Sequence, residues 1–238
     1  MRHEIDVSVV VPVYNEVGNV ADVVRRVRAA LAGAGLSWEL VAVDDGSSDG
    51  SGERLDELAA ADPALRVLHL DRNCGQSAAL DAGFRHAAGR LVAVLDADLQ
   101  TYPEDLPELV ARLESSGAGA VVGIRAARQD TGWRRVTSRF ANGVRNWLTR
   151  EDIQDTGCPL KVLRAEAVRS LRPFDGMHRF LPTLLRLEGF AVVEVPVRHA
   201  PRTAGSSKYG TWDRAFRGLR DALGVRWLQD RHLRWRLR

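Results

Sequence analysis

Residues 7–16 read VSVVVPVYNE, and this stretch decides the fold that the rest of the sequence is expected to adopt. Its first part, Val7 to Val13, is a β-branched run typical of a strand buried on both faces of a sheet. Apolar residues then recur at helical spacing over residues 20–31, and the pattern ends at Gly33. A second strand is expected over residues 39–43, which completes a strand, helix and strand unit with parallel strands and a right-handed crossover.

Beyond this unit, strands and helices continue to alternate as far as residue 148 and become irregular thereafter. We therefore expect an α/β protein whose central sheet is mostly parallel, with helices on both faces and an amphipathic C-terminal helix. The main domain is expected over residues 1–210 and a basic helical tail over residues 211–238. The further expected elements are helices over residues 51–60, 76–87, 103–115 and 133–148, strands over residues 66–70, 91–95, 120–124, 159–163 and 190–197, and two short helices between the last two strands.

The composition is that of an ordinary globular domain. The chain of 238 residues is 45% hydrophobic and 27% charged, with 34 Lys and Arg against 31 Asp and Glu. The two cysteines, Cys74 and Cys158, have no zinc-ligand spacing, which suits a reducing compartment. No apolar run approaches the ~18 residues of a membrane-spanning helix, and the first residues are polar rather than a signal peptide. A cytoplasmic protein is therefore expected.

Polar side chains gather after the expected strands. In open α/β sheets, ligands bind in the crevice outside the carboxyl ends of the strands, so these side chains are expected to line one crevice. They are Asn15, Glu16, Asp44, Asp45, Asn73, Asp96 and Asp98.

The pair of carboxylates in Asp96-Ala97-Asp98 indicates a divalent metal site, because hard oxygen ligands suit Mg²⁺ or Mn²⁺ completed by phosphates and water. The alternative is that these acidic residues only cap a strand end. The glycine-containing loop at residues 44–50 does not indicate a different kind of phosphate-binding site. It lacks both the GxGxxG pattern and a Walker lysine, which disfavours a dinucleotide site or a P-loop.

Four motifs in this order and spacing resemble the family 2 glycosyltransferases of the GT-A fold. They are PVYNE at residues 12–16, DDGSSDG at 44–50, NCG at 73–75 and DADLQ at 96–100. The resemblance extends from about Val7 to Gly210 and is strongest to the dolichol-phosphate mannosyltransferase-like branch, which includes bacterial polyprenyl-phosphate sugar transferases. It implies a GT-A catalytic domain over residues 1–210.

The resemblance implies a donor site and a metal site. Asp98 and Gln100 would ligate Mg²⁺ or Mn²⁺ on the diphosphate of a GDP- or UDP-sugar, and Asp98 would thereby serve catalysis. The alternative for Tyr14 and Glu16 is that the former packs in the core and the latter caps the next helix. The residues implied to hold the nucleotide sugar are Pro12, Tyr14, Glu16, Asp44, Asp96 and Ala97.

The resemblance also implies an acceptor site. Asp155, in DTGCPLK at residues 155–161, matches an acceptor-side aspartate and is the candidate general base. A hydroxyl acceptor needs such a base, whereas a phosphate monoester is already charged and needs positioning more than deprotonation. The alternative is a loop or helix-capping acid. The implied phosphate-binding residues are Arg125, Arg139, Arg202 and Lys208.

The last part of the chain is strongly basic. Residues 198–238 contain 11 basic and 3 acidic side chains. Apolar residues fall on one stripe of the expected helix, which either packs on the domain or lies on an anionic membrane surface. The stripe consists of Trp212, Phe216, Leu219, Leu223 and Trp227.

Together these features predict a metal-dependent, inverting glycosyltransferase that moves one sugar from a nucleotide donor to a polyprenyl phosphate at the inner face of the membrane. One alternative is a family 2 enzyme with a hydroxyl acceptor in polysaccharide or glycolipid synthesis. A second is a noncatalytic binding module whose basic tail grips nucleic acid or a protein. Nucleic acid is not expected as a partner, because the acidic crevice would repel it.

Overall fold

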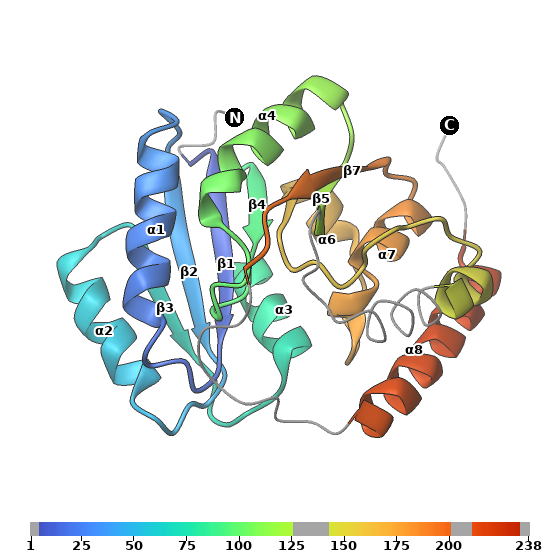
Figure 1. The fold of residues 1–238 in the computed structure, drawn as a ribbon, viewed down its shortest axis with the longest axis horizontal. Coiled ribbons are helices and arrows are strands. Elements are labelled where there is room, and N and C mark those ends of the chain that lie inside the picture. Colours follow the sequence, from blue (N-terminus) through green and yellow to red (C-terminus); the bar gives the residue numbers. More distant parts are fainter. Residues whose placement is uncertain (1–4, 126–142, 201–210, 234–238) are drawn as a thin grey trace.

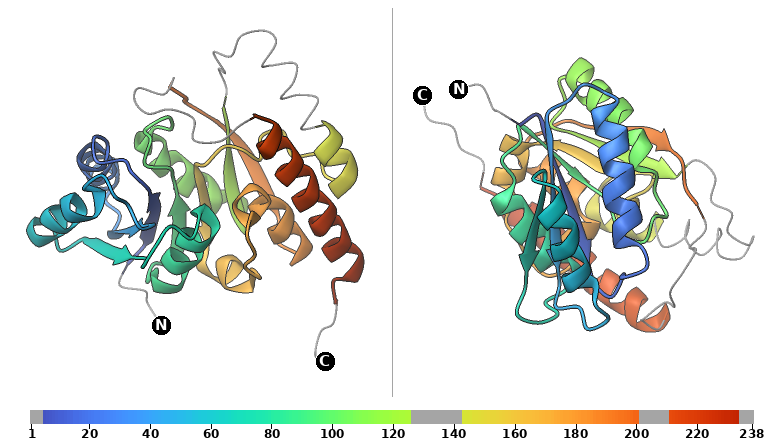
Figure 2. Two further views of the ribbon diagram at one scale, coloured as in Figure 1. Left: turned by 90° about the horizontal axis from the view of Figure 1, so that it is seen from below. Right: turned by 90° about the vertical axis from the view of Figure 1, so that its left-hand side faces the viewer.

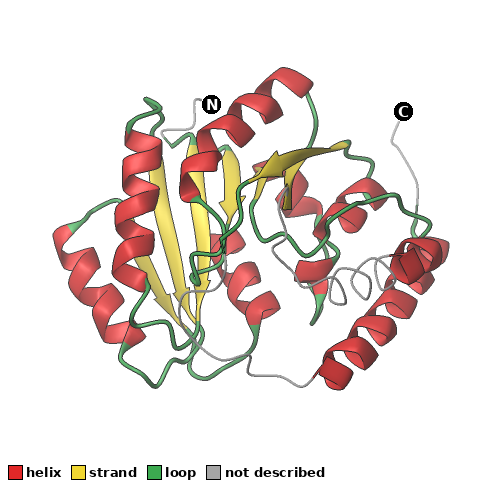
Figure 3. Ribbon diagram, viewed as in Figure 1, coloured by secondary structure: helices red, strands yellow, loops and turns green. Residues whose placement is uncertain are grey.

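The computed structural model describes residues 5–125, 143–200 and 211–233, and in the last range it describes side chains from residue 218 onward. Strands form a central sheet with helices on both faces (Figures 1 and 3). The elements are β1 (Val7–Val13), α1 (Val20–Ala32), β2 (Trp38–Asp44), α2 (Ser51–Ala61), β3 (Leu65–His69), α3 (Gln76–His86), β4 (Leu91–Val94), η1 (Pro103–Asp105), α4 (Leu106–Ser116), β5 (Ala120–Arg125), β6 (Lys161–Arg164), α6 (Ala165–Ser170), η2 (Met177–Arg179), α7 (Leu181–Leu187), β7 (Val192–Val197) and α8 (Thr211–Arg231).

The seven strands of the sheet lie in the order β3-β2-β1-β4-β6-β5-β7. Strands β1 to β4 are mutually parallel, and β5 is parallel to β7. Strand β6 is antiparallel to both of its neighbours, β4 and β5. The mostly parallel α/β architecture expected from the sequence is therefore confirmed, and β6 is the single reversed strand of this sheet. Because β6 is reversed, its first residue, Lys161, pairs with Val94 at the carboxyl end of β4.

Two hydrophobic cores lie on opposite faces of the sheet. The first packs α1, α2 and α4 against the sheet, and the second packs α3, α6, α7 and α8 against it. Strand β1 serves both cores, because Val9 and Val11 belong to the first and Val10 to the second. All three are at most 1% exposed, which agrees with the buried strand that the β-branched run predicted.

Pro12 lies where β1 separates from β4. Pairing between these strands ends at Val10 and Val94, and the Val10 carbonyl oxygen then accepts a hydrogen bond from Leu95 N–H at 3.4 Å. Alternate residues of a strand turn their backbone polar groups to the same side, so the missing N–H of Pro12 also faces β4. Because β4 has already ended at this level, the proline removes no hydrogen bond between the strands.

Helix α8 packs on the domain through one face. Ala222 and Val225 are each 1% exposed within the second core, and Arg179 forms a 3.0 Å ion pair with Asp221. The helical segment over residues 143–149 lies beside α8 (Figure 2), where Gln229 Nε2 donates to the Thr149 carbonyl oxygen at 2.7 Å. No helix of the described residues is long and apolar enough to cross a membrane.

The stripe of α8 is turned away from this packed face. Leu219, Leu223 and Trp227 are 45%, 52% and 63% exposed, so the interpretation in which these three residues pack on the domain is wrong. Small residues make the packed contact instead, which the apolar spacing alone did not indicate. The side chains of Trp212 and Phe216, and the domain boundary expected at residue 210, lie outside the described part of the chain.

Two glycines with the same backbone φ angle allow a test of how closely the loop after β2 approaches the backbone of residues 72–73. Gly46 and Gly35 both have φ of 67°, but a Cβ on Gly46 would lie 2.4 Å from the Arg72 carbonyl carbon, whereas Gly35 has nothing within 4 Å. We expect Gly35→Ala to cost about 1 kcal/mol of the free energy of unfolding from strain alone. We expect Gly46→Ala to cost about 3 kcal/mol, because the backbone of residues 72–73 must also move. Urea unfolding measures both, and equal losses would contradict the close approach.

Candidate active site

The candidate site lies at the carboxyl ends of β1, β2 and β4. The chain runs from β1 to β2 and β3 on one side of the sheet, whereas β4 lies on the other side of β1. This reversal of strand order is the position at which open α/β sheets bind ligands. The loops that follow β1 and β4 begin at Tyr14 and Leu95, so the motifs at residues 12–16 and 96–100 flank the crevice.

Hydrogen bonds join the loop after β1 to the loop after β2. Asn15 N–H donates to Ser47 Oγ at 3.0 Å, and Ser48 N–H donates to Asn15 Oδ1 at 2.8 Å. Glu16 N–H donates to Ser51 Oγ at 2.8 Å. Asn15 has φ of 54°, a left-handed conformation that asparagine tolerates better than most residues. These bonds fix Tyr14 and Glu16 relative to the loop at residues 44–50.

Glu16 also takes part in the start of α1. Its carbonyl oxygen accepts the N–H groups of Asn19 and Val20 at 2.8 and 3.1 Å, and its Oε2 accepts Asn19 Nδ2 at 2.6 Å. The Glu16 carboxylate thus binds the side chain of Asn19, the residue before α1, and this is not the bond to a helix N–H group that capping requires. The carboxylate is half-buried at the same edge of the crevice, so its position also remains compatible with a bound nucleotide.

The two neighbouring aspartates after β2 have different surroundings. Asp45 is 3% exposed, and its carboxylate accepts Cys74 N–H at 2.6 Å, Gly75 N–H at 2.9 Å and Asn73 Nδ2 at 3.1 Å. Burial raises the pKa of Asp45, and the two backbone N–H groups oppose that rise. This carboxylate holds the loop that leads into α3.

Asp44, implied to bind nucleotide, is 6% exposed and already has contacts on both oxygens. Oδ1 accepts Ser47 N–H at 3.0 Å, and Oδ2 lies 3.1 Å from His69 Nδ1. His69 Nε2 lies 3.0 Å from Asp56, and the hydrogen bond to Asp56 is the main cause that raises the pKa of His69. Asp44 is thus a fixed acceptor at the base of the loop.

The loop after β4 forms a tight turn. Leu99 has φ of 56°, and Gln100 N–H donates to Asp98 Oδ1 at 3.2 Å. Asp96 Oδ1 accepts Gln76 Nε2 at 2.8 Å, and Ala97 is 3% exposed in the first core. The turn thereby separates a deep carboxylate, Asp96, from a pair of oxygen-bearing side chains, Asp98 and Gln100.

The side chains of this turn suit a hard divalent cation. Asp98 offers carboxylate oxygens and Gln100 an amide oxygen, which is the chemistry that Mg²⁺ and Mn²⁺ prefer. Among the residues that the structure describes, no three His, Cys, Asp or Glu side chains gather into a metal site. A cation here would therefore rely on oxygens from a bound diphosphate and water as well.

The same turn is attached to the end of β7. Thr101 forms an isolated antiparallel bridge with His199, and Ala200 N–H donates to the Gln100 carbonyl oxygen at 2.8 Å. Two arginines flank the next residue, Tyr102, with guanidinium carbons 5.1 Å (Arg26) and 5.0 Å (Arg198) from the ring centroid.

Each of these arginines also binds a carboxylate. Arg26 binds Glu104 through two hydrogen bonds of 2.8 and 2.7 Å, and Arg198 Nε donates to Asp105 at 2.7 Å. The stack on Tyr102 therefore ties α1, the turn after β4 and the end of β7 together.

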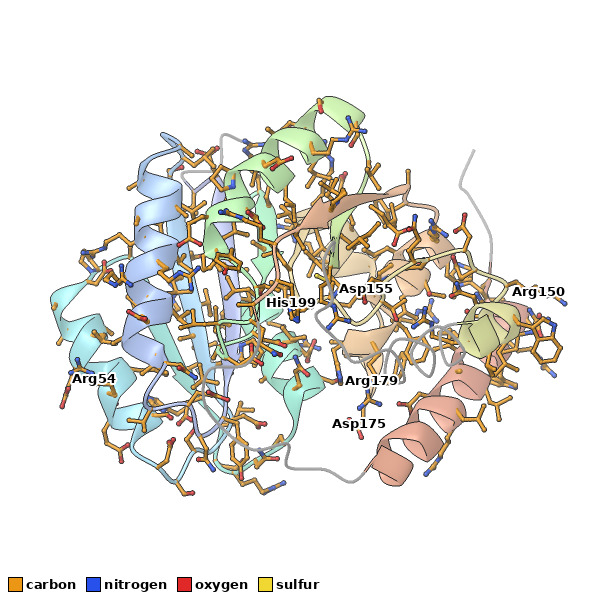
Figure 4. The ribbon with its side chains drawn as sticks, in the orientation of Figure 1. Arg54, Arg150, Asp155, Asp175, Arg179 and His199 are labelled. Carbon is orange, nitrogen blue, oxygen red and sulfur yellow. The ribbon has the colours of Figure 1, made fainter. Side chains whose placement is uncertain are left out.

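The structure brings together two residues that the resemblance assigned to the acceptor site. Arg125, at the end of β5, donates from Nε to Asp155 Oδ2 at 2.7 Å and from Nη2 to Asp155 Oδ1 at 2.8 Å. Asp155 is 7% exposed, and its Oδ1 also accepts Gly157 N–H at 3.2 Å. This fork is a rigid, charge-assisted pair. Figure 4 places Asp155 and His199 in the middle of the molecule.

Lys161 connects the two sides of the site electrostatically. It begins β6, is 3% exposed, and its Nζ donates to the Cys158 carbonyl oxygen. Burial lowers the pKa of Lys161, and the negative charges of Asp96 and Asp155 oppose this shift. The buried Lys161 side chain therefore interacts electrostatically with Asp96 on one side of the site and with Asp155 on the other.

His178 contacts the first turn of α3. It is half-buried, and its Nδ1 lies 2.8 Å from Ser77 Oγ in the first turn of α3. Burial lowers the pKa of His178 to about 3, and the positive charges of Arg179 and Lys161 add to the effect. The sequence contains no local signal for this pairing, because the two residues are far apart in the chain.

Some residues of the site were given no role from the sequence. Gln76 and Ser77 lie in none of the quoted motifs, and Lys161 ends the motif at residues 155–161 without an assigned role. Their effects on the predicted residues depend on contacts between distant segments. Three of the residues that the resemblance assigned to phosphate binding lie outside the described part of the chain: Arg139, Arg202 and Lys208.

The family model for glycosyl transferase family 2 matches residues 8–172, and the chain belongs to this family. This confirms the resemblance read from the motifs at residues 12–16, 44–50, 73–75 and 96–100 and places the chain among the glycosyltransferases.

Curated relatives define the branch more closely. The chain is 43% identical over 206 residues to undecaprenyl-phosphate 4-deoxy-4-formamido-L-arabinose transferase of Edwardsiella ictaluri, covering 86% of this chain and 63% of that protein. It is 38% identical over 225 residues to dodecaprenyl-phosphate galacturonate synthase of Rhizobium johnstonii, covering 93% and 66%. The chain thus spans slightly less than two thirds of the length of these relatives. Both names belong to polyprenyl-phosphate sugar transferases, the branch that the motifs indicated.

Solved structures confirm the fold. Glucosyl-3-phosphoglycerate synthase of Mycobacterium tuberculosis superposes with a TM-score of 0.70 at 24% identity, covering 93% of this chain and 81% of that one. A mannosyltransferase from Pyrobaculum calidifontis in complex with GDP-Man and Mn²⁺ gives a TM-score of 0.64 at 20% identity, covering 94% and 70%. The predicted GT-A arrangement is therefore the one observed.

The buried environment of His178 predicts an acid-sensitive contribution to stability. The unfolded chain binds a proton near the ordinary pKa of 6.5, whereas the folded chain binds it only near pH 3. Between these values the unfolded state binds more protons, so stability falls as the pH is lowered. We expect the wild type to lose about 2 kcal/mol more than His178→Gln between pH 7 and pH 5 in urea unfolding.

The control for this measurement is His86→Gln, at an exposed position near the end of α3. This variant shows whether removing any histidine changes the loss of stability between pH 7 and pH 5 to the same extent. Identical pH slopes for the wild type and His178→Gln would contradict the buried, neutral state of His178.

Proposed function

We propose that the protein transfers a single sugar from a GDP- or UDP-sugar to a polyprenyl phosphate, with inversion at the anomeric carbon. The observation that carries this proposal is that β6 pairs with β4, which brings the Arg125–Asp155 pair beside the start of β6 to the same edge of the sheet as the Asp96–Gln100 turn that follows β4. The names of the relatives support the choice of acceptor.

The donor side holds the nucleotide sugar at the carboxyl ends of β1, β2 and β4. Tyr14 and Glu16 are fixed by the loop after β2 and contact the base and ribose, since carboxylates accept bonds from ribose hydroxyls and base N–H groups. Asp44 accepts a hydrogen bond from Ser47 N–H and so stabilises the loop after β2. Pro12, Asp96 and Ala97 complete the wall of this subsite.

Asp98 and Gln100 would hold Mg²⁺ or Mn²⁺ at the diphosphate. The bound cation would supply positive charge that stabilises the departing nucleoside diphosphate. The chain holds these two side chains in position, because the turn at Leu99 orients Asp98 and the bridge between Thr101 and His199 stabilises the turn. The Mn²⁺ and GDP-Man bound to the Pyrobaculum calidifontis mannosyltransferase support this assignment.

The acceptor is a phosphate rather than a hydroxyl. A hydroxyl acceptor needs a base, but both oxygens of Asp155 already receive hydrogen bonds from the Arg125 guanidinium in an ion pair. A phosphate monoester has a second pKa of about 6 and needs no base at neutral pH. Asp155 therefore orients Arg125 toward the acceptor, and a phosphate oxygen attacks the anomeric carbon as the bond to the nucleoside diphosphate breaks.

The protein meets its lipid acceptor as a peripheral protein at the inner face of the membrane, through the exposed apolar stripe of α8. Leu219, Leu223 and Trp227 face away from the domain. Trp147, on the helical segment that contacts α8, is 79% exposed. Exposed arginines such as Arg220 on the same helix suit anionic headgroups.

The transfer reaction tests the function directly. Purified protein, a labelled nucleotide sugar and polyprenyl phosphate should give a labelled glycolipid and a nucleoside diphosphate, and the reaction should require Mg²⁺ or Mn²⁺. We expect Asp98→Ala to lower the rate at least about 100-fold, because a charge-stabilising group is lost. Scintillation counting of extracted lipid and a coupled assay for the nucleotide measure both products.

Asp22→Ala is the control, because Asp22 is an exposed carboxylate on α1 that binds Arg25. It should retain wild-type activity. A parallel reaction with the free polyprenol in place of its phosphate separates the two acceptor classes. Faster transfer to the alcohol, or an Asp98→Ala variant of wild-type activity, would overturn the proposal.

Membrane attachment is measured by sedimentation with anionic liposomes. We expect binding that weakens as salt is raised, because headgroup attraction to arginine is screened. Replacing Leu223 and Trp227 together by serine should reduce binding about 10-fold or more, since two apolar side chains no longer insert. Val17→Ser is the control, because Val17 is also an exposed apolar residue, 43% exposed, but precedes α1. Equal sedimentation with and without liposomes at low salt would contradict the attachment.

A further inference from the structure

The first turn of α3 carries two side chains that serve different halves of the site. Gln76 donates to Asp96 on the donor side. The next residue, Ser77, contacts Gly176 and His178, which come from the segment before α7. The second contact has no part in holding the donor loop, so it requires its own explanation.

The hydroxyl of Ser77 determines which nitrogen of His178 carries the proton. Gly176 N–H donates to Ser77 Oγ at 3.0 Å, so the oxygen already accepts one bond. Ser77 is 5% exposed, and a buried hydroxyl hydrogen needs an acceptor. His178 Nδ1, 2.8 Å from Ser77 Oγ, is the acceptor available to it. Nδ1 is therefore unprotonated, and the neutral ring carries its hydrogen on Nε2.

Burial keeps the His178 ring neutral, and Arg179, on the same short helix, and Lys161, at the start of β6, add to this effect. Asp175, three residues before His178, is exposed, and Asp221 of α8 is engaged by Arg179 at 3.0 Å. His178 therefore offers a hydrogen-bond donor without adding a positive charge. The described residues contain no hydrogen-bond partner for its Nε2.

The position of His178 places this donor on the acceptor side. Gln76 contacts Asp96 and the next residue, Ser77, contacts His178, and Lys161 interacts electrostatically with Asp96, Asp155 and His178. His178 belongs to η2, which leads into α7 and packs on α3, whereas the donor loops follow β1, β2 and β4. Figure 4 shows Asp175 and Arg179, on either side of His178 in the sequence, between α3 and α8.

We propose that His178 is an acceptor-binding residue, whose Nε2–H donates a hydrogen bond to the phosphate of the acceptor while Ser77 fixes the tautomer. This inference rests on the proposed function. A phosphate near Arg125 and Lys161 already has basic side chains beside it. The neutral imidazole contributes a directional hydrogen bond to the phosphate and no further positive charge. The donor on Nε2 is present throughout the neutral range, because Ser77 holds the other nitrogen.

Two substitutions distinguish the Nε2–H from the rest of the ring. Glutamine places an N–H₂ group near the position of Nε2, whereas the shorter asparagine reaches only the position of Nδ1. We expect His178→Asn to raise KM for polyprenyl phosphate about 10- to 100-fold, the loss of one hydrogen bond to a charged group. We expect His178→Gln to stay within about 3-fold of the wild type. KM for the nucleotide sugar should change less than about 2-fold in both.

The outcomes separate the inference from the function on which it rests. Absence of transfer to polyprenyl phosphate by the wild type would reject the proposed function itself. If the wild type transfers sugar, three results would each reject the role of His178 alone. They are an equal change of the KM for polyprenyl phosphate in both variants, no change in either variant, and a changed KM for the nucleotide sugar. Thermal unfolding of each variant shows whether it is folded, and the comparison with glutamine then isolates the hydrogen-bond donor.

The tautomer is tested without any substrate. Nitrogen NMR of the histidine side chains should show His178 protonated on Nε2 and neutral from about pH 5 to pH 8. Ser77→Ala should remove the fixed tautomer and give a mixture of both forms. A proton on Nδ1 in the wild type, or the same tautomer distribution in Ser77→Ala, would overturn the inference.

Discussion

The carboxylate of Asp45 is the interaction on which the rest of the site depends. It accepts the backbone N–H groups of Cys74 and Gly75 and the side chain of Asn73, and so fixes the loop that begins α3. A buried carboxylate that lost these donors would pay the full cost of desolvation. Because α3 starts at a fixed point, Gln76 reaches Asp96 and Ser77 reaches His178.

The sheet divides the molecule into two functional halves. The parallel strands β1 to β4 end at the donor loops, and Pro12 marks the separation of β1 from β4. The second half contributes the Arg125–Asp155 pair and the segment before α7. Contacts between the halves include the hydrogen bond from the first turn of α3 to His178, the bridge between Thr101 and His199, and the stack of Arg26 and Arg198 on Tyr102.

Residue patterns that are local in the chain predicted the fold and the donor loops well. The β-branched run at residues 7–13 and the motif at residues 96–100 lie at their expected places. The roles of Lys161, Ser77 and His178 were not predictable, because they arise from packing between segments distant in sequence. Helix α8 was misjudged in part for the same reason: apolar spacing identifies a stripe, but only the fold shows that Ala222 and Val225 make the contact.

The reversed direction of β6 separates the origins of the two specificities. In the parallel half, the chain enters the site as it leaves a strand, whereas around β6 it reaches the site in the segment that leads into the strand and leaves at the opposite end. In the proposed function, the loops that leave the parallel strands before residue 100 hold the donor, whereas the acceptor side uses later stretches of the chain, among them the segment with Asp155 that leads into β6. With these roles, exchange of the later stretch between relatives would change the acceptor side and leave the donor loops as they are.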